Sequence, residues 1–93
     1  MPISVIVPRA LTPYTRGVGT LVIEERCRTV GDALAAVAAR VPALTDRVLT
    51  EQGELRRHVN VFVDEESVRF IDGLATPVPD GSTITILPAV SGG

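Results

Sequence analysis

One alanine-rich segment, residues 29–40, limits what this chain can fold into, because it carries the strongest helical pattern in the sequence. Thr29 and Asp32 have the spacing of a helix N-cap, and Pro42 is expected to end the helix. Its apolar residues share one stripe: Val30, Leu34, Val37 and Val41. One such helix covers one face of a sheet, so the chain is expected to form two layers.

Four other segments have the composition of short strands. They are residues 3–7, 20–24, 58–64 and 83–87. The segment 58–64 alternates valine with other residue types and gives the clearest strand signal. A further short edge strand is expected around residues 68–70. Residues 43–57 have only weak periodicity, which predicts one turn of helix or an ordered loop.

The order of these segments, two strands, a helix and two strands, predicts an α+β fold. A hairpin followed by a right-handed crossover through the helix makes the first and last strands parallel neighbours in a mixed sheet. This is the β-grasp, or ubiquitin-like, arrangement. A chain of 93 residues, 45% of them hydrophobic, is expected to form one domain. We assign residues 1–88 to that domain and residues 89–93 to a flexible C-terminal tail.

Charge and composition disfavour several functional classes. The formal net charge is -2 and the arginines are dispersed, so no nucleic acid partner is expected. No apolar run approaches the ~18 residues of a membrane span, and the start lacks a signal-peptide pattern, so we expect a cytoplasmic protein with no membrane partner. Cys27 is the only cysteine and His58 the only histidine. These two residues give no internal disulfide and no plausible metal site, and no bound cofactor is expected.

A series of short motifs, densest from residue 58 onward, is similar to one protein family. The motifs are Val59-Asn60-Val61, Asp64-Glu65, Val68-Arg69-Phe70, Gly73-Leu74-Ala75-Thr76, Asp80-Gly81 and Leu87-Pro88-Ala89-Val90-Ser91-Gly92-Gly93. The chain resembles the ubiquitin-like sulfur carriers of the MoaD/ThiS family over essentially its whole length. Within that family it is most similar to the cysteine-biosynthesis, or CysO, type.

The resemblance implies a function for the two terminal glycines, Gly92 and Gly93. A partner E1-like enzyme would use ATP to adenylate the carboxylate of Gly93, and a sulfur donor would convert the acyl-adenylate into a thiocarboxylate. The carrier would then give its sulfur to a biosynthetic enzyme. On this interpretation the protein is a cosubstrate and not an enzyme. The residues fit this chemistry, because glycines lack a Cβ and let the backbone pass through a narrow active site.

Two alternatives remain open at this point. A ubiquitin-like modifier would conjugate through Gly93 to lysines of other proteins, although the absence of lysine from this chain prevents it from building chains on itself. The small subunit of a heteromeric enzyme such as molybdopterin synthase would keep its C-terminus inside the active site of the large subunit. The receiving pathway, whether cysteine or another sulfur-containing metabolite, is not specified by the sequence.

Strand alternation predicts a second contact surface. If the valines and isoleucines of three strands face the helix, then Ile6, Phe62 and Leu87 form an apolar row on the open face of the sheet. An exposed apolar patch marks an interface, so we expect this row to dock the adenylating enzyme. The residues assigned to partner binding are Ile6, Phe62, Leu87, Pro88, Val90 and Ser91. In isolation the carrier is expected to be a monomer.

Overall fold

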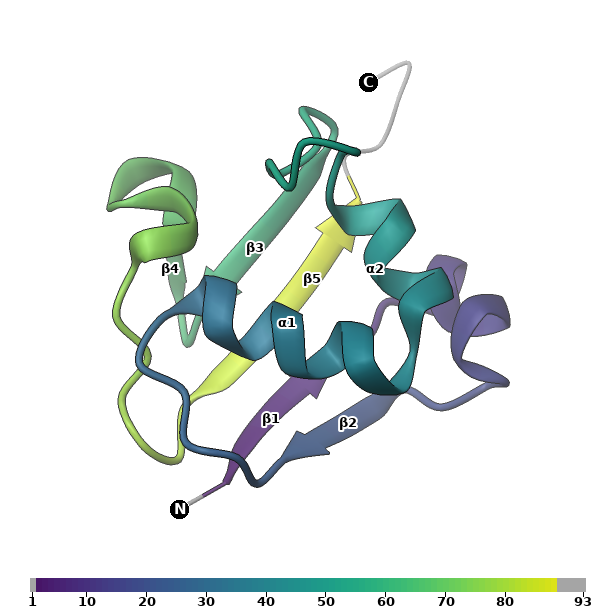
Figure 1. Cartoon of the computed structure of the whole chain (residues 1–93), viewed down its shortest axis with the longest axis horizontal. Coiled ribbons are helices and arrows are strands. Elements are labelled where there is room, and N and C mark those ends of the chain that lie inside the picture. The colour runs from purple at the N-terminus through teal and green to yellow at the C-terminus, as the bar shows by residue number, and fades with distance from the viewer. Residues whose placement is uncertain (1, 89–93) are drawn as a thin grey trace.

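A computed structural model describes residues 2–88, which form one mixed sheet with helices packed against it (Figure 1). Among these residues the sheet has five strands in the order β2-β1-β5-β3-β4. They are β1 (Ile3–Ile6), β2 (Thr20–Ile23), β3 (Val59–Val63), β4 (Glu66–Ser67) and β5 (Thr83–Pro88). β1 and β5 are parallel, and the other neighbours are antiparallel. The predicted β-grasp arrangement is therefore confirmed, including the pairing of the first strand with the last.

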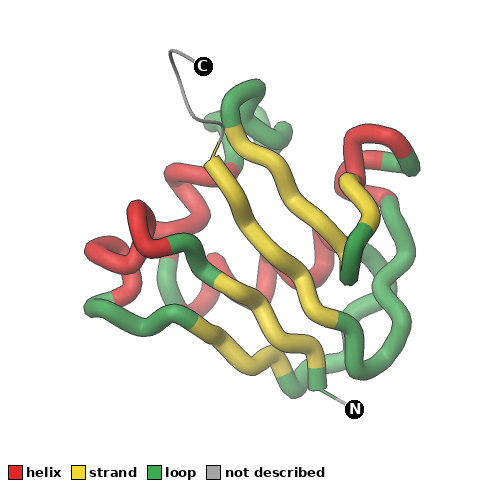
Figure 2. Tube along the Cα trace, turned by 180° about the vertical axis from the view of Figure 1, so that it is seen from behind, coloured by secondary structure: helices red, strands yellow, loops and turns green. Residues whose placement is uncertain are grey.

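The helices cover one face of this sheet. α1 (Val30–Arg40) crosses the sheet in Figure 1, and α2 (Pro42–Val48) follows it after a sharp turn. Figure 2 shows the opposite face, where no helix of the described part of the chain lies in front of the strands. We call this second surface the open face. A single helical layer therefore leaves one side of β1, β3 and β5 available for contacts.

α1 forms where the sequence predicts it, and its N-terminus has a complete capping box. The Thr29 side chain accepts a hydrogen bond from the amide of Asp32, and the Asp32 carboxylate accepts one from the amide of Thr29. This reciprocal pair satisfies two amides that a helix start otherwise leaves without partners. The helix ends before Pro42, as expected, but Pro42 is also the first residue of α2.

Three local predictions are wrong. Residues 42–48 form a helix of two turns instead of one turn or a loop, because Leu44 and Val48 share one face and are both fully buried. Between the first two predicted strands the sequence predicts a loop containing Pro13 and Gly17, but Arg9–Thr15 form a 3₁₀ helix, η1. The edge strand is β4 and not residues 68–70, which form a second 3₁₀ helix, η2 (Val68–Phe70). A third, η3 (Gly73–Ala75), follows it.

The position of β4 follows from the turn before it. Asp64 adopts a left-handed conformation with φ 54°, which permits a tight two-residue hairpin and places Glu66 directly opposite Val63. Two residues later the side chain of Val68 is fully buried. Since Val68 must turn into the core, the pairing with β3 ends at Ser67.

The core lies between the helices and the covered face of the sheet. Alternate residues of β1, β3 and β5 are buried, so the predicted direction of their side chains is confirmed. The largest fully buried side chains include Ile3, Ile23, Leu34, Leu44, Ile84 and Ile86. The remaining side chains of the same strands must point to the open face.

Candidate functional site

The candidate site begins where β5 leaves the sheet. Pro88, the last described residue, is paired with Val59 at the start of β3, and Leu87 is paired with Asn60. Leu87 is 43% exposed, which is high for a leucine inside a strand. The rest of the predicted site, Val90, Ser91, Gly92 and Gly93, lies outside the described residues. β5 therefore brings the chain to one end of the sheet, with an exposed apolar residue directly before that end.

The open face carries the three apolar residues predicted there, although not as a single row. Ile6 and Phe62 are both paired with Thr85 on opposite sides of β5. Thr85, and not Leu87, therefore lies between them. Leu87 is two residues further along β5, diagonal to Phe62, at a spacing of roughly 7 to 8 Å in a regular sheet. The error arose because the sequence gives the parity of each strand but not its register.

We call Ile6, Phe62 and Leu87 the open-face patch. Ile6 and Phe62 are half-buried and Leu87 is exposed. Threonine and serine side chains surround them on the same face, at Ser4, Thr20, Ser67, Thr83 and Thr85. Such a surface has an apolar centre and a largely hydroxyl rim, with the Arg69 guanidinium beside Leu87, 3.2 Å from the side chain of Asn60. Protein interfaces commonly have this composition, with charged residues depleted at the centre.

Arg69 fixes the end of the sheet from which the C-terminus departs. Its Nη2 donates hydrogen bonds to the backbone carbonyls of Arg56 at 2.6 Å, Arg57 at 3.1 Å and Val59 at 2.6 Å. Its Nε donates to the side-chain oxygen of Asn60 at 3.2 Å. One guanidinium thus joins η2 to the loop before β3 and to the first residues of β3. Those residues are the partners of Leu87 and Pro88.

Sequence analysis did not assign a role to Arg69, although the residue belongs to one of the family motifs. Its acceptors are mostly backbone carbonyls, which any residue supplies, so no pattern of side chains marks them. The sequence offered no signal for these contacts, because Glu65, Glu66 and Asp72 stand three or four residues from Arg69 and would have suggested ion pairs instead. We call Arg69 and its four acceptors the Arg69 clamp.

Cys27 belongs to the core and not to the candidate site. The residue is 5% exposed, and its Sγ lies 3.5 Å from the carbonyl oxygen of Glu25. Burial raises the pKa of the Cys27 thiol above its usual value, and the carboxylates of Asp32 and Glu25 raise this pKa further. A position before the start of a helix can lower the pKa of a thiol, but at Cys27 desolvation and the nearby carboxylates have the larger effect. The thiol is therefore kept protonated and unreactive.

The described residues contain no metal-binding cluster of three or more histidine, cysteine or acidic side chains. His58 is exposed and precedes β3. Between residues 2 and 88 there is also no helix that is both long and apolar enough to cross a lipid bilayer.

Comparison with known proteins identifies related sequences over the full chain. The model of the ThiS family matches residues 5–93. The sulfur carrier protein CysO of Mycobacterium tuberculosis is 38% identical over a 99-residue alignment that covers 100% of both chains. The small archaeal modifier protein 3 of Haloferax volcanii is 40% identical over 65 residues, or 70% of each chain. These similarities include both carriers of sulfur and a protein modifier.

Solved structures show the same architecture. A chain in the crystal structure of the Amycolatopsis orientalis BexX/CysO complex superposes with a TM-score of 0.86 at 38% sequence identity. The superposition covers 98% of this chain and 99% of that one. The similarity thus extends from the order of the strands to their arrangement in space.

Proposed function

This chain belongs to the ThiS family of ubiquitin-like sulfur carriers, and we propose that it carries sulfur as a thiocarboxylate on Gly93. In this proposal an E1-like enzyme adenylates the Gly93 carboxylate, a sulfur donor converts it into the thiocarboxylate, and a biosynthetic enzyme accepts the sulfur. The chain is a small carrier and a cosubstrate of these enzymes. We propose a cytoplasmic location for it, where ATP is available for the first step.

The observation that carries this proposal is the extent of the family match. The match includes the terminal glycines and reaches Gly93, and the CysO relatives align over their whole length. A match confined to the folded part would support the fold alone. Here the similarity includes the segment on which the proposed chemistry takes place.

The proposed reaction follows from the chemistry of a carboxylate. An oxygen of the Gly93 carboxylate attacks the α-phosphorus of ATP, and pyrophosphate leaves. A sulfide-equivalent nucleophile then attacks the acyl carbon, and AMP leaves as the carboxylate carbon gains its bond to sulfur. Adenylation is needed because oxide is a poor leaving group and AMP is a good one. The product holds a sulfur anion in a covalent bond, so free sulfide does not have to diffuse between enzymes.

A second contact is needed because the terminal residues bind weakly alone. Ordering about four of them in an enzyme costs roughly 1 to 2 kcal/mol each in backbone entropy. We propose that the open-face patch supplies this contact by docking the adenylating enzyme, while Pro88, Val90 and Ser91 lead Gly92 and Gly93 into its active site. The patch extends from the level of Thr85 to the end of β5, where Leu87 directly precedes Pro88. The BexX/CysO complex is a precedent for a CysO protein with a bound partner.

The central test is the intact mass of the protein after it is produced together with its native adenylating enzyme and sulfur donor. Replacement of one oxygen by one sulfur at the C-terminus is the expected product, and tandem mass spectrometry should locate it on Gly93. Deletion of Gly93 is the matched control and should abolish the product. A deletion variant that still transfers sulfur would refute the proposal.

Docking through the patch has its own test. The double substitution Phe62→Asp, Leu87→Asp should reduce the kcat/KM of adenylation because it places two charges at the centre of an apolar contact. Val18→Asp is the control, since Val18 is 44% exposed in the loop before β2. Circular dichroism must show that both variants fold. Unchanged kinetics in a folded double variant would exclude the patch as the docking surface while leaving the carrier function intact.

A protein modifier is the second candidate function, and the similarity to small archaeal modifier protein 3 favours it. A modifier would also be adenylated at Gly93 but would then form an isopeptide bond with a lysine of another protein. The same mass measurement distinguishes the two, because an adduct joined to a target peptide replaces the thiocarboxylate. Stable copurification with a large catalytic subunit would instead indicate a molybdopterin synthase type of assembly.

The destination of the sulfur is proposed from the relatives. The similarity of this chain to CysO proteins favours cysteine or another small sulfur-containing metabolite as the product. Incubation of the purified thiocarboxylate with candidate acceptor enzymes tests this, since only the true acceptor should return the carrier to its carboxylate form.

A further inference from the structure

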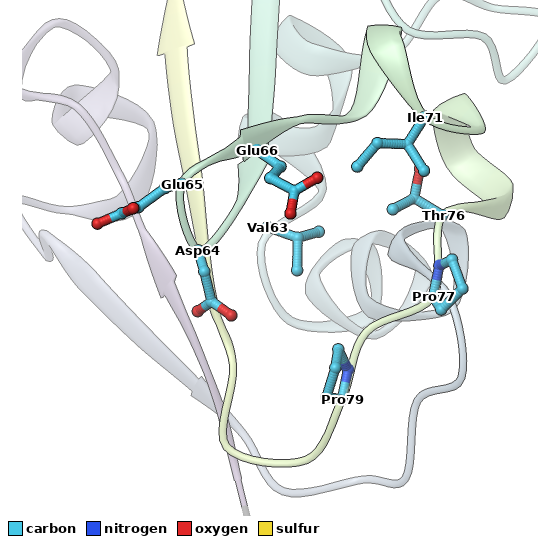
Figure 3. Close-up of a pocket in the computed structure, with 8 residues that line it drawn as sticks. All are labelled: Val63, Asp64, Glu65, Glu66, Ile71, Thr76, Pro77 and Pro79. Carbon is cyan, nitrogen blue, oxygen red and sulfur yellow. The ribbon is translucent and has the colours of Figure 1, made fainter.

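A groove on the side of the molecule away from the open-face patch has no role in the proposed function. It lies between the hairpin that joins β3 to β4 and the segment that leads from η2 to β5 (Figure 3). Its volume is about 440 Å³. The residues that matter for its chemistry are Val63, Asp64, Glu66, Ile71, Pro77 and Pro79. We call these six residues the acidic groove.

The inner surface of the acidic groove is apolar. Val63 lies at its base and is 8% exposed, whereas Ile71 is 46% exposed on the opposite wall. Pro77 and Pro79 are exposed and complete that wall. Phe70, which precedes Ile71, is 89% exposed. Exposed apolar side chains at two successive positions, Phe70 and Ile71, indicate a contact surface for another molecule.

The rim of the groove is negatively charged and partly rigid. Asp64 is held in place because its amide donates to the carbonyl of Thr83 at 2.7 Å and its Oδ1 accepts from the amide of Thr83 at 3.0 Å. Figure 3 shows the Glu66 carboxylate over Val63, on the side that faces the other wall, whereas Glu65 points away from the groove. Two carboxylates therefore border the cavity.

These carboxylates have no positive partner within the chain. Across residues 2–88, the only ion pair is between Arg40, at the end of α1, and Glu25, in the loop after the opposite edge strand β2. The guanidinium of Arg69 is held by carbonyl and amide oxygens instead. The negative charge of the groove is thus available to a cation from outside.

We propose that the acidic groove binds a segment of a protein partner in which an arginine or a lysine stands between aliphatic residues. The long stem of such a side chain can pack on Ile71 and Pro77 while its charged end reaches Glu66. Arginine fits best, because its planar guanidinium binds a carboxylate through two parallel hydrogen bonds.

The place of the groove in the fold makes this contact compatible with use of the C-terminus. Val63 is paired with Ile84 at the start of β5, whereas Pro88 is at its end. The four steps along β5 from Ile84 to Pro88 separate the groove from the end of the strand by about 13 Å at the usual rise of a strand. A partner in the groove therefore leaves the end of β5 uncovered. Phe62 of the open-face patch precedes Val63 in the chain, but its side chain points to the opposite face of the sheet. This inference does not rest on the proposed sulfur chemistry.

The test is nuclear magnetic resonance titration of the ¹⁵N-labelled full chain with short synthetic peptides. The probe is acetyl-Leu-Arg-Leu-Arg-Leu-amide, and its analogues replace arginine by citrulline or by glutamate, or leucine by glycine. With the arginine-leucine peptide, the amide signals of Val63, Glu66, Ile71 and Thr76 should shift at up to millimolar concentrations. The citrulline, glutamate and glycine analogues should each shift them less.

Substitutions in the groove separate this site from general charge attraction. Glu66→Gln should weaken binding of the arginine-leucine peptide roughly two- to fivefold, the usual range for one exposed ion pair. Ile71→Ser should weaken it without any change in charge. Glu24→Gln, a loss of the same charge at an exposed residue of the loop after β2, is the control and should leave the affinity unchanged.

Several results would overturn the inference. Shifts confined to the open face, at Ile6, Thr85 or Phe62, would place the contact elsewhere. Equal binding of the arginine and citrulline peptides would show that charge plays no part in the contact. If Glu24→Gln weakened binding as much as Glu66→Gln, the attraction would depend on the net charge of the protein and not on the groove. Absence of any shift at millimolar peptide would exclude the groove as a site of this kind.

Discussion

The Arg69 clamp gives a prediction whose size can be worked out from its four hydrogen bonds. Arg69→Ala removes them all. The carbonyls of Arg56 and Arg57 belong to exposed contacts and can bind water instead. The contact with the Val59 carbonyl is partly buried, so water replaces it poorly and almost all of its contribution to stability should be lost. A hydrogen bond to a charged group contributes about 1.5 to 3 kcal/mol, and we expect the free energy of unfolding to fall by about 2 to 3 kcal/mol.

Such a loss is large for a domain of this size. A chain of this length has a total stability of roughly 5 to 14 kcal/mol. Each kcal/mol of lost unfolding free energy lowers the Tm by about 4 to 8 °C, so Arg69→Ala should lower the Tm by roughly 10 to 20 °C. Thermal and urea unfolding, followed by far-ultraviolet circular dichroism, measure both quantities. Arg69→Lys should recover only part of the loss, because an ammonium group lacks the fork that reaches several carbonyls at once.

The matched control is Arg57→Ala. It removes the same charge from the same loop, but no side-chain hydrogen bond of Arg57 is found within the described residues. Its unfolding free energy should stay within about 0.5 kcal/mol of the unsubstituted protein, as is usual for exposed positions. Amide hydrogen exchange should also become faster at Asn60 and Leu87 in Arg69→Ala alone. If the two alanine variants unfold alike, the clamp does not stabilise this end of the sheet and the reasoning is wrong.

Three further predictions concern the folded body. Thr29→Ala should lower the unfolding free energy by about 1 kcal/mol through loss of the capping box, with Thr29→Ser close to neutral; an unchanged urea midpoint for the alanine variant would contradict this. Leu44→Ala should cost about 2 to 5 kcal/mol because the side chain is fully buried in α2, and a loss below 1 kcal/mol in the same assay would show that α2 is not part of the core. Cys27 should react with iodoacetamide at least about tenfold more slowly than free cysteine at pH 8, since a raised pKa and burial both reduce the exposed thiolate. The rate should increase as the pH rises, and unfolding in urea should restore the rate of free cysteine.

Local patterns were sufficient for the main elements of the fold. The alanine-rich segment, its apolar stripe and its capping residues identified α1. The alternation of valine and isoleucine identified β1, β3 and β5 together with their buried faces. These signals depend on contacts within a few residues, or on the simple rule that one face is apolar. The order of the segments then left few arrangements, because connections of this kind are right-handed.

The features that the sequence did not predict depend on contacts between distant segments. α2 is short and becomes stable only because Leu44 and Val48 are buried by the rest of the protein. Its weak periodicity therefore gave little signal. The edge strand was misplaced because the burial of Val68, and not the composition of residues 68–70, ends the pairing with β3.

The sequence by itself determined the fold class, the covered face of the sheet and the family to which the chain belongs, because periodicity and motifs are local properties. Only the tertiary structure decided that Thr85 separates Ile6 from Phe62, and only it brought Arg69 to the carbonyls beside the end of β5. It also assembled the acidic groove from the β3–β4 hairpin and from residues 71–79. Register and hydrogen bonds to the backbone depend on how segments far apart in the chain meet, and the sequence of a single segment does not record this.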